Sequence, residues 1–577
     1  MVQAYAAPFR RSMIDFPLTA GLNFRYWRLC RLLILLSLIV CSNKVFPTTV
    51  VAPDTFYVVQ PSGFRYEVTP KGDIHQNWTE TSSGHTVINI SGVWYFAADP
   101  ASDAASLRSS NIEVTEKTLA SPPSSAQGVR PGRVLPDDSS STHNPRSSAV
   151  AGDLNGISFS SIYPNPKGSY RTLFHSLDPL DGARTASPAL TNVTQKVLLI
   201  MLEYQNQEFN YGPGSFNSLI FGSGSGSVKS YFLENSYDTF TVAPAEETDT
   251  SAGGTANDGI IKVAIARDHP NTKYLNNTDK HEAIDLASAS IDFSDFDTDK
   301  DKNLSDEELS IVFIVAGYEN AYGGDGAKEP RVWGHKSSLG RKTADGVQLA
   351  RYAMFGEQHV YASENVNRQA SIGIIAHELG HLMLGLPDIY DTNSDNNGTT
   401  GGDAGVGDWG LMASGTWNKL AGQASGTKPG LMLGWSKINS NRPMATYEIL
   451  DKATDNSVLQ LDGADAESDY LLIKPEYDNY GFTTEYFLLE NRQQEGFDEA
   501  LPAEGLIITH NGVGKNNSDR NSGVQVEIEM PSGGEYSGAE APWPRGATTT
   551  FDDDSAHGNA KWSFGDSNIS LTNLSIK

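Results

Sequence analysis

The sequence contains almost no cysteine. Among its 577 residues only Cys30 and Cys41 are cysteines, and both lie near the N-terminus. The rest of the chain can therefore form neither an internal disulfide nor a thiolate metal site. Any metal bound there must be held by histidine and carboxylate side chains.

Positive charge is also scarce. Lys+Arg 43 against Asp+Glu 70 gives 43 − 70 = −27. A surface this acidic repels a phosphate backbone, so we expect no nucleic-acid partner. The same balance suits a highly soluble exported protein that binds divalent cations. Nothing in the sequence indicates an oligomeric state.

No apolar run is long enough for a stable membrane span. The run Leu32–Val40 follows Arg25, Arg28 and Arg31. A bilayer span needs about 20 apolar residues, so a basic region before so short a run predicts a secretory signal, which we place in residues 1–45. We therefore expect a secreted, extracellular protein.

Composition divides the remaining chain into four segments and predicts an α+β fold. Strand-like runs separated by glycines predict a small β-rich unit at 54–116, and serine and proline predict a linker at 117–195. Residues 196–437 contain two continuous apolar runs, typical of strands buried on both faces, and helical periodicity at 371–384. Short strands return in the C-terminal β-rich region, residues 438–577.

The most informative motif is His377-Glu378-Leu-Gly-His381. On a helix the two histidines lie one turn apart on the same face and can bind one zinc ion. Glu378 would be the catalytic general base toward a water on that ion. From the histidine and glutamate content, about 0.01 such matches are expected by chance. The apolar residues around the motif predict a buried helix, which argues against two ordinary surface histidines.

Elimination narrows the candidates for the third zinc ligand. No glutamate occurs between Glu378 and Glu448, and Gly385 with Pro387 should end the helix and turn the chain back. Asp388 lies just past this turn and is the best-placed oxygen ligand. It is alternatively a residue that orients a ligating histidine. The other candidates are Asp391, Asp403 and Asp408.

A second cation site is predicted at residues 297–308, whose spacing matches a twelve-residue EF-hand loop. Its expected calcium ligands are Asp297, Asp299, Asp301, Asn303, Ser305 and Glu308. The sixth position, normally glycine, is Lys302. We expect a structural calcium here; the alternative is a solvated acidic turn.

These motifs together resemble the M6 peptidases, the immune inhibitor A family of secreted bacterial metalloproteases. The resemblance rests on the zinc-helix segment His377–Asp391 and on Gly407-Asp-Trp-Gly-Leu-Met412, with support from Trp333-Gly-His335 and Glu490-Asn-Arg492. It implies a metzincin-like zinc endopeptidase made as a zymogen, with Met412 in a turn beneath the zinc. One residue more than the metzincin spacing separates His381 from Gly385.

The resemblance also implies that the unit at 54–116 is a propeptide. A side chain of this unit, such as Asp73 or His75, is then a candidate for covering the zinc until the linker is cut. The expected substrates are proteins or peptides. The alternatives are a calcium-stabilised extracellular binding or adhesion module with a non-catalytic zinc site, and zinc hydrolysis of another substrate such as an ester. Glu378 favours an enzyme, because a purely structural zinc site has no use for a carboxylate facing its open position.

Overall fold

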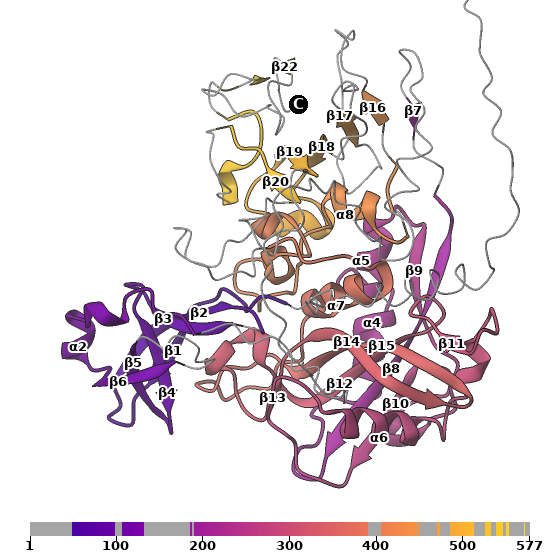
Figure 1. Cartoon of the computed structure of the whole chain (residues 1–577), viewed down its shortest axis with the longest axis horizontal. Helices are drawn as coiled ribbons and strands as arrows, with labels where there is room; N and C mark the ends of the chain where they lie inside the picture. The colour runs from indigo at the N-terminus through magenta and orange to yellow at the C-terminus, as the bar shows by residue number, and fades with distance from the viewer. Residues whose placement is uncertain are drawn as a thin grey trace, which may run out of the picture. The chain divides into compact units, whose positions relative to one another are not determined.

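The computed structural model describes a large part of the chain (Figure 1). It covers residues 49–131 without 75 and 99–106, 185–390 without 187–189, and 406–450 without 443 and 447. Further on it covers 470–473, 485–512, 525–531, 538–545 and a few residues between 548 and 571. All of these belong to one compact unit, 46–577. The expected signal at 1–45 and most of the expected linker lie outside the described residues.

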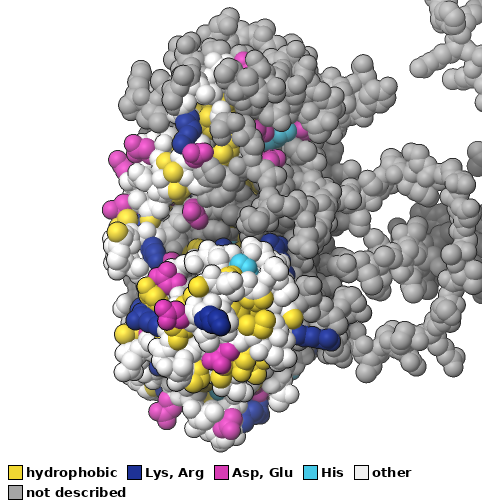
Figure 2. Space-filling view, turned by 90° about the vertical axis from the view of Figure 1, so that its left-hand side faces the viewer, with side chains coloured by type: hydrophobic (Ala, Val, Ile, Leu, Met, Phe, Trp, Pro, Cys, Tyr) yellow, Lys and Arg dark blue, Asp and Glu magenta, His cyan; other side chains and the backbone are white. Residues whose placement is uncertain are grey.

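An antiparallel sheet comes first in the chain, with its strands in sequence order. They are β1 (Phe56–Val59), β2 (Arg65–Gly72), β3 (Asn77–Thr81), β4 (Thr86–Ile90), β5 (Val93–Ala98) and β6 (Arg108–Glu113). Helix α2 (Glu116–Ala120) and the turn η1 (Ser124–Ala126) follow. Thr86 and Gln76 donate side-chain hydrogen bonds to the carbonyls of Val129 and Pro131, so the packed unit continues to residue 131. On the face seen in Figure 2, hydrophobic and charged side chains are interspersed.

A mainly parallel sheet forms the centre of the molecule. Its path is β10 (Ile260–Ile265), β8 (Val193–Tyr204), β12 (Ser310–Glu319), β15 (Val347–Gln358) and β11 (Asn303–Leu304). Off this path, β9 (Phe240–Pro244) pairs with β8, β13 (Arg331–Val332) with β12, and β14 (His335–Ala344) antiparallel with β15.

Helices cover both faces of this sheet. Leu199 and Met201 of β8 pack in one core with α4 (Pro213–Phe221), α5 (Val228–Asn235) and α7 (Ile372–Leu384). Leu198 and Ile200 pack in a second core with α6 (Asn277–Ala287), which lies on the opposite face (Figure 1). Alternate residues of one strand thus enter two cores, which confirms the prediction of strands buried on both faces.

A third sheet lies toward the C-terminus. Its order is β20 (Val526–Ile528), β19 (Gly505–Asn511), β18 (Tyr486–Arg492), β17 (Leu471–Ile473), β16 (Glu448–Leu450) and β7 (Thr185–Ala186). Helix α8 (Gly434–Asn439) precedes β16 in the chain, and β21 (Phe551–Asp552) pairs with β22 (Ser570–Leu571). His510 on β19 lies between two carboxylates, Glu485 at 2.8 Å and Glu529 at 3.2 Å.

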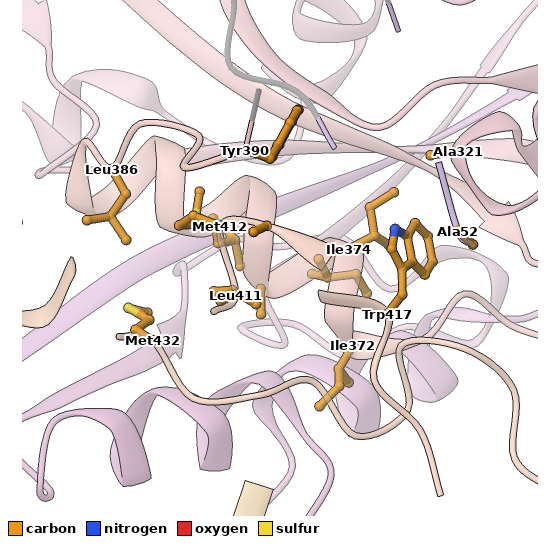
Figure 3. Close-up of a cluster of buried hydrophobic side chains, with 14 of the residues drawn as sticks. Ala52, Ala321, Ile372, Ile374, Leu386, Tyr390, Leu411, Met412, Trp417 and Met432 are labelled. Atoms are coloured by element: carbon orange, nitrogen blue, oxygen red, sulfur yellow. The ribbon is translucent and has the colours of Figure 1, made fainter. Parts of the chain in front are cut away.

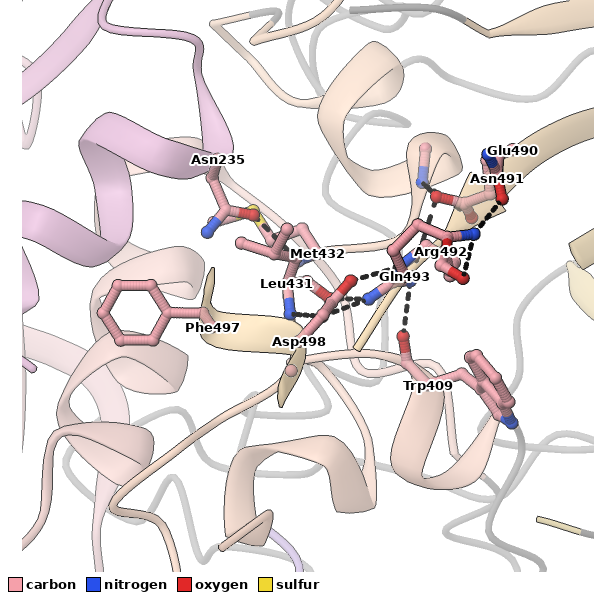
Figure 4. Close-up of polar contacts among 12 residues, drawn as sticks. Asn235, Trp409, Leu431, Met432, Glu490, Asn491, Arg492, Gln493, Phe497 and Asp498 are labelled. Carbon is pink, nitrogen blue, oxygen red and sulfur yellow. Dashed lines mark hydrogen bonds and ion pairs between the residues drawn. The ribbon is translucent and has the colours of Figure 1, made fainter. Parts of the chain in front are cut away.

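A buried polar network joins this sheet to the loops that carry Trp409 and Leu431 (Figure 4). Arg492 of β18 donates hydrogen bonds to Asp498, to the Trp409 carbonyl and to the Leu431 carbonyl. The described residues thus form a mixed α/β fold with few helices. Among them, no helix has the length and apolar character that crossing a bilayer requires.

Short 3-10 turns connect many of these elements. Those described are η2 (Ser251–Gly253), η3 (Phe293–Phe296), η4 (Asn320–Tyr322), η5 (Gly324–Gly326), η6 (Gly407–Trp409), η7 (Ser414–Trp417), η8 (Gly496–Ala500) and η10 (Gly538–Glu540).

Candidate active site

Helix α7 carries the histidine motif through the interior of the protein. All 13 of its residues are buried, because the helix itself carries apolar side chains on nearly every side. A Cβ at Gly373 would lie 1.9 Å from the Thr416 carbonyl oxygen, so this helix can approach the η7 loop only through a glycine. The helix ends at Gly385, whose φ of 66° is left-handed, as the sequence predicts.

The two histidines of α7 and Asp388 point at one place. The Nε2 atoms of His377 and His381 are 3.0 Å apart, and each lies 3.2 Å from the same carboxylate oxygen of Asp388. The far ring nitrogens are held by backbone carbonyls: His377 Nδ1 lies 2.8 Å from Leu411 O and His381 Nδ1 2.6 Å from Leu386 O. Since a carbonyl only accepts, each Nδ1 carries the proton and each Nε2 presents a lone pair.

The charges of this cluster suit a bound cation. Burial alone would raise the pKa of Asp388, yet the neighbouring imidazoles hold it below its usual range, so the carboxylate stays ionised. Burial keeps the pKa of His381 below its ordinary value, whereas Asp388 and Glu378 outweigh burial and raise that of His377. Two lone pairs and an anionic oxygen that converge in a buried site suit a divalent metal, and nitrogen–oxygen sets of this kind are typical of zinc.

Glu378 lies beside this cluster and is completely buried. Burial raises the pKa of its carboxyl group to about 8. One carboxylate oxygen accepts a hydrogen bond from the Thr49 hydroxyl, and the other, Oε2, has no hydrogen-bond partner among the residues that the structure describes. An oxygen with this freedom next to His377, His381 and Asp388 is suitably placed to handle a proton.

The loop at Met412 packs directly against α7 (Figure 3). Leu411 supplies the carbonyl that orients His377, and the Met412 carbonyl accepts a hydrogen bond from the Ile389 N–H at 3.0 Å. A Cβ at Gly380 of α7 would lie 3.1 Å from the Met412 sulfur, so the loop and the helix are in close contact. The Met412 loop therefore fixes both His377 and the segment that carries Asp388.

The segment 49–54, which the sequence does not mark as functional, runs past the same site. Thr49 is fully buried, and its hydroxyl is the group that contacts Glu378. Thr49 precedes the β-rich unit in which Asp73 and His75 are the predicted candidates for covering the zinc. Asp73 accepts a hydrogen bond from the Gln76 N–H within a turn of the first sheet, and residue 75 lies outside the described residues. The sequence gives no signal for Thr49, because its role depends on a contact with a residue more than 300 positions away.

The other predicted ligands occupy separate places. Asp408 lies in η6 and outside the cluster of two histidines and Asp388, and residues 391 and 403 are not among those described. In the EF-hand-like loop, single carboxylate oxygens of Asp297, Asp299 and Glu308 lie within 4.8 Å of one another.

The rest of this loop holds those carboxylates in place. The Ser305 hydroxyl donates to Glu308 at 2.9 Å, and the N–H groups of Asp301 and Asn303 donate to carboxylates of the loop. Lys302 takes the φ of 66° that the sixth position requires, so the loop makes its turn without glycine.

The fold and the site are those of a metallopeptidase, with a histidine-glutamate-histidine helix at the centre of a mixed α/β domain. Residues 195–445 match the model of the immune inhibitor A peptidase M6 catalytic domain. Residues 195–445 are therefore an M6 peptidase catalytic domain, and the protein is a metalloendopeptidase, a hydrolase acting on peptide bonds. No curated protein matches the chain. The family assignment decides for an enzyme and against the alternative of a binding module.

Proposed function

We propose that this protein is a secreted zinc endopeptidase, made as a zymogen, in which His377, His381 and Asp388 hold the zinc. The observation that carries the proposal is the convergence of two imidazole Nε2 atoms on one Asp388 oxygen, each ring being oriented by a carbonyl on its far side. This arrangement needs no movement of the protein to receive a metal. M6 metallopeptidases as a family are zinc-dependent, which agrees with the donor set.

When bound, zinc would supply a Lewis acid that polarises the scissile carbonyl and activates water. The protein's own contribution is the proton transfer. Glu378 Oε2 has no hydrogen-bond partner among the described residues, so it can take a proton from the attacking water and pass it to the leaving amine. The apolar surroundings of α7 exclude other water and keep the charges of the site effective.

The contacts of residues 49–54 support the zymogen part of the proposal. While Thr49 holds one oxygen of Glu378 and its backbone passes the site, a substrate chain cannot reach the same carboxylate. Cleavage within the segment 132–184 would free residues 49–131 from the catalytic domain. We propose that this cut activates the enzyme.

Calcium and secretion complete the proposal. The carboxylates of Asp297, Asp299 and Glu308 belong to the loop that leads into β12, the strand at the centre of the parallel sheet. A calcium ion at these residues would neutralise their mutual repulsion and stabilise that loop. The basic and apolar pattern within residues 1–45 is the basis for proposing export, and calcium outside the cell would keep such a site filled.

Elemental analysis of the purified chain tests the zinc site directly. The full chain is equilibrated with zinc and dialysed, and the bound metal is counted in wild type, His381→Ala, Asp388→Asn and Glu378→Gln. We expect the first two variants to lose one zinc and Glu378→Gln to keep it. His281→Gln, which changes a histidine that contacts the Leu339 carbonyl away from the cluster, is the matched control. Full zinc content in His381→Ala would contradict the proposed site.

A further inference from the structure

The segment 49–54 is held in the manner of a bound peptide. The indole N–H of Trp333 donates to the Thr49 carbonyl at 3.1 Å, and that of Trp417 donates to the next carbonyl, that of Val50, at 2.8 Å. Both tryptophans are buried. A buried N–H group that loses its acceptor is costly, so any chain that replaces this segment gains by presenting carbonyls at the same two places.

Asp54 ends this segment in a site of its own. Both of its carboxylate oxygens lie 2.7 Å from the ammonium nitrogen of Lys419, and one also accepts a hydrogen bond from the Ser425 hydroxyl. The side chains of Lys419 and Asp54 are 36% and 23% exposed, so solvent reaches this site. An ammonium and a hydroxyl on one carboxylate are the contacts expected for recognition of an acidic side chain.

The position of this site is fixed relative to α7. The Ser425 carbonyl accepts a hydrogen bond from the Ser371 hydroxyl at 2.8 Å, and Gly373 N–H donates to the Gly426 carbonyl at 2.9 Å. These bonds tie the loop that carries Ser425 to the first turn of the zinc helix. Lys419 and Ser425 therefore belong to the catalytic domain and remain in place when the N-terminal segment leaves.

We propose that Lys419 and Ser425 form a substrate subsite that selects an aspartate or glutamate side chain. The selected residue lies five positions along the substrate from the residue that takes the place of Thr49 beside Glu378. In the zymogen, Asp54 fills this subsite. An extended chain covers about 17 Å in five residues, which is within the reach of a bound peptide substrate. The inference rests on the proposed function, because it assigns substrate specificity to the same active site. Lys419 binds a side chain away from the reacting atoms and is a specificity-determining residue.

Two measurements on the full chain, activated by a cut in the linker, test the subsite. The first uses quenched-fluorescence peptides in which a single aspartate is moved along both sides of the cleaved bond, each paired with its asparagine counterpart. We expect one position at which aspartate lowers KM about five- to tenfold relative to asparagine, with kcat little changed. The second uses a peptide of the sequence 49–56 as an inhibitor, and we expect exchange of its aspartate for asparagine to weaken inhibition by a similar factor.

The variants separate the subsite from other effects. In Lys419→Met the preference for aspartate over asparagine should disappear, both in the cleaved peptides and in the inhibitor. Lys419→Arg should largely keep both preferences, and Ser425→Ala should weaken them in part. Lys428→Met is the matched control, since this lysine pairs with Glu499 and should leave the preferences unchanged. A chain that cleaves peptides yet prefers aspartate at no position, or prefers it equally in Lys419→Met, would overturn the subsite and leave the proposed function standing. Absence of any cleavage by the cut, zinc-loaded chain would overturn both.

Discussion

The Arg492 network offers the sharpest test of how the protein holds its site together. The guanidinium is fully buried and makes hydrogen bonds of 2.6 and 2.7 Å to Asp498 and of 2.9 Å to the Trp409 carbonyl. Arg492→Met keeps most of the side-chain volume but leaves Asp498 as a buried anion opposite an apolar group. Breaking a buried ion pair by removing one partner costs about 3–5 kcal/mol, which we expect as the loss in free energy of unfolding.

Urea unfolding followed by tryptophan fluorescence measures this loss, since Trp409 itself belongs to the network. The matched control is Arg545→Met, because Arg545 and its partner Glu540 have side chains 44% and 49% exposed. An exposed pair of this kind contributes at most about 1 kcal/mol. If the two variants lower the free energy of unfolding by the same small amount, the reasoning from burial is refuted.

Three further predictions concern the N-terminal segment, pH and calcium. In Gly326→Ala the new Cβ would lie 1.9 Å from Cζ of Phe56, so we expect the uncut chain to loosen this segment and gain peptidase activity over wild type. Burial acts to lower the pKa of His510, but its two glutamate partners raise it to about 9, above its ordinary 6.5. The stability that protonated His510 contributes is therefore fully present below about pH 6.5 and is lost as the pH rises through about 9. The melting temperature of His510→Gln should lack this dependence on pH. We expect calcium to raise the melting temperature of the wild type and Glu308→Gln to abolish this rise; an equal rise in the variant would contradict a calcium site in this loop.

Local patterns in the sequence predict the parts of the fold that depend on local chemistry. The apolar run at 197–202 and that at 311–316 become β8 and β12, buried on both faces, because a continuous apolar run can satisfy two cores at once. Helix α7 and its end at Gly385 follow from apolar periodicity and from the left-handed conformation that glycine adopts readily. The same motif brings His377 and His381 together, since residues four apart on a helix share a face.

Contacts between distant segments could not be predicted from the sequence. Thr49 meets Glu378, and Lys419 meets Asp54, across separations of 329 and 365 residues. Neither pair has a spacing or a composition that distinguishes it from ordinary surface residues. The sequence also leaves Asp388 among several candidate aspartates, because the path of the chain after Gly385 depends on how Ile389 bonds to the Met412 carbonyl.

The central claim is that Glu378 performs proton transfer at a zinc site formed by α7. The most direct test compares wild type and Glu378→Gln, both cut in the linker and both shown to hold equal zinc, in the cleavage of an unfolded protein substrate with and without a zinc chelator. We expect cleavage by wild type that chelator abolishes and zinc restores, and none by Glu378→Gln. Cleavage by the variant at the wild-type rate, with zinc bound, would contradict the account.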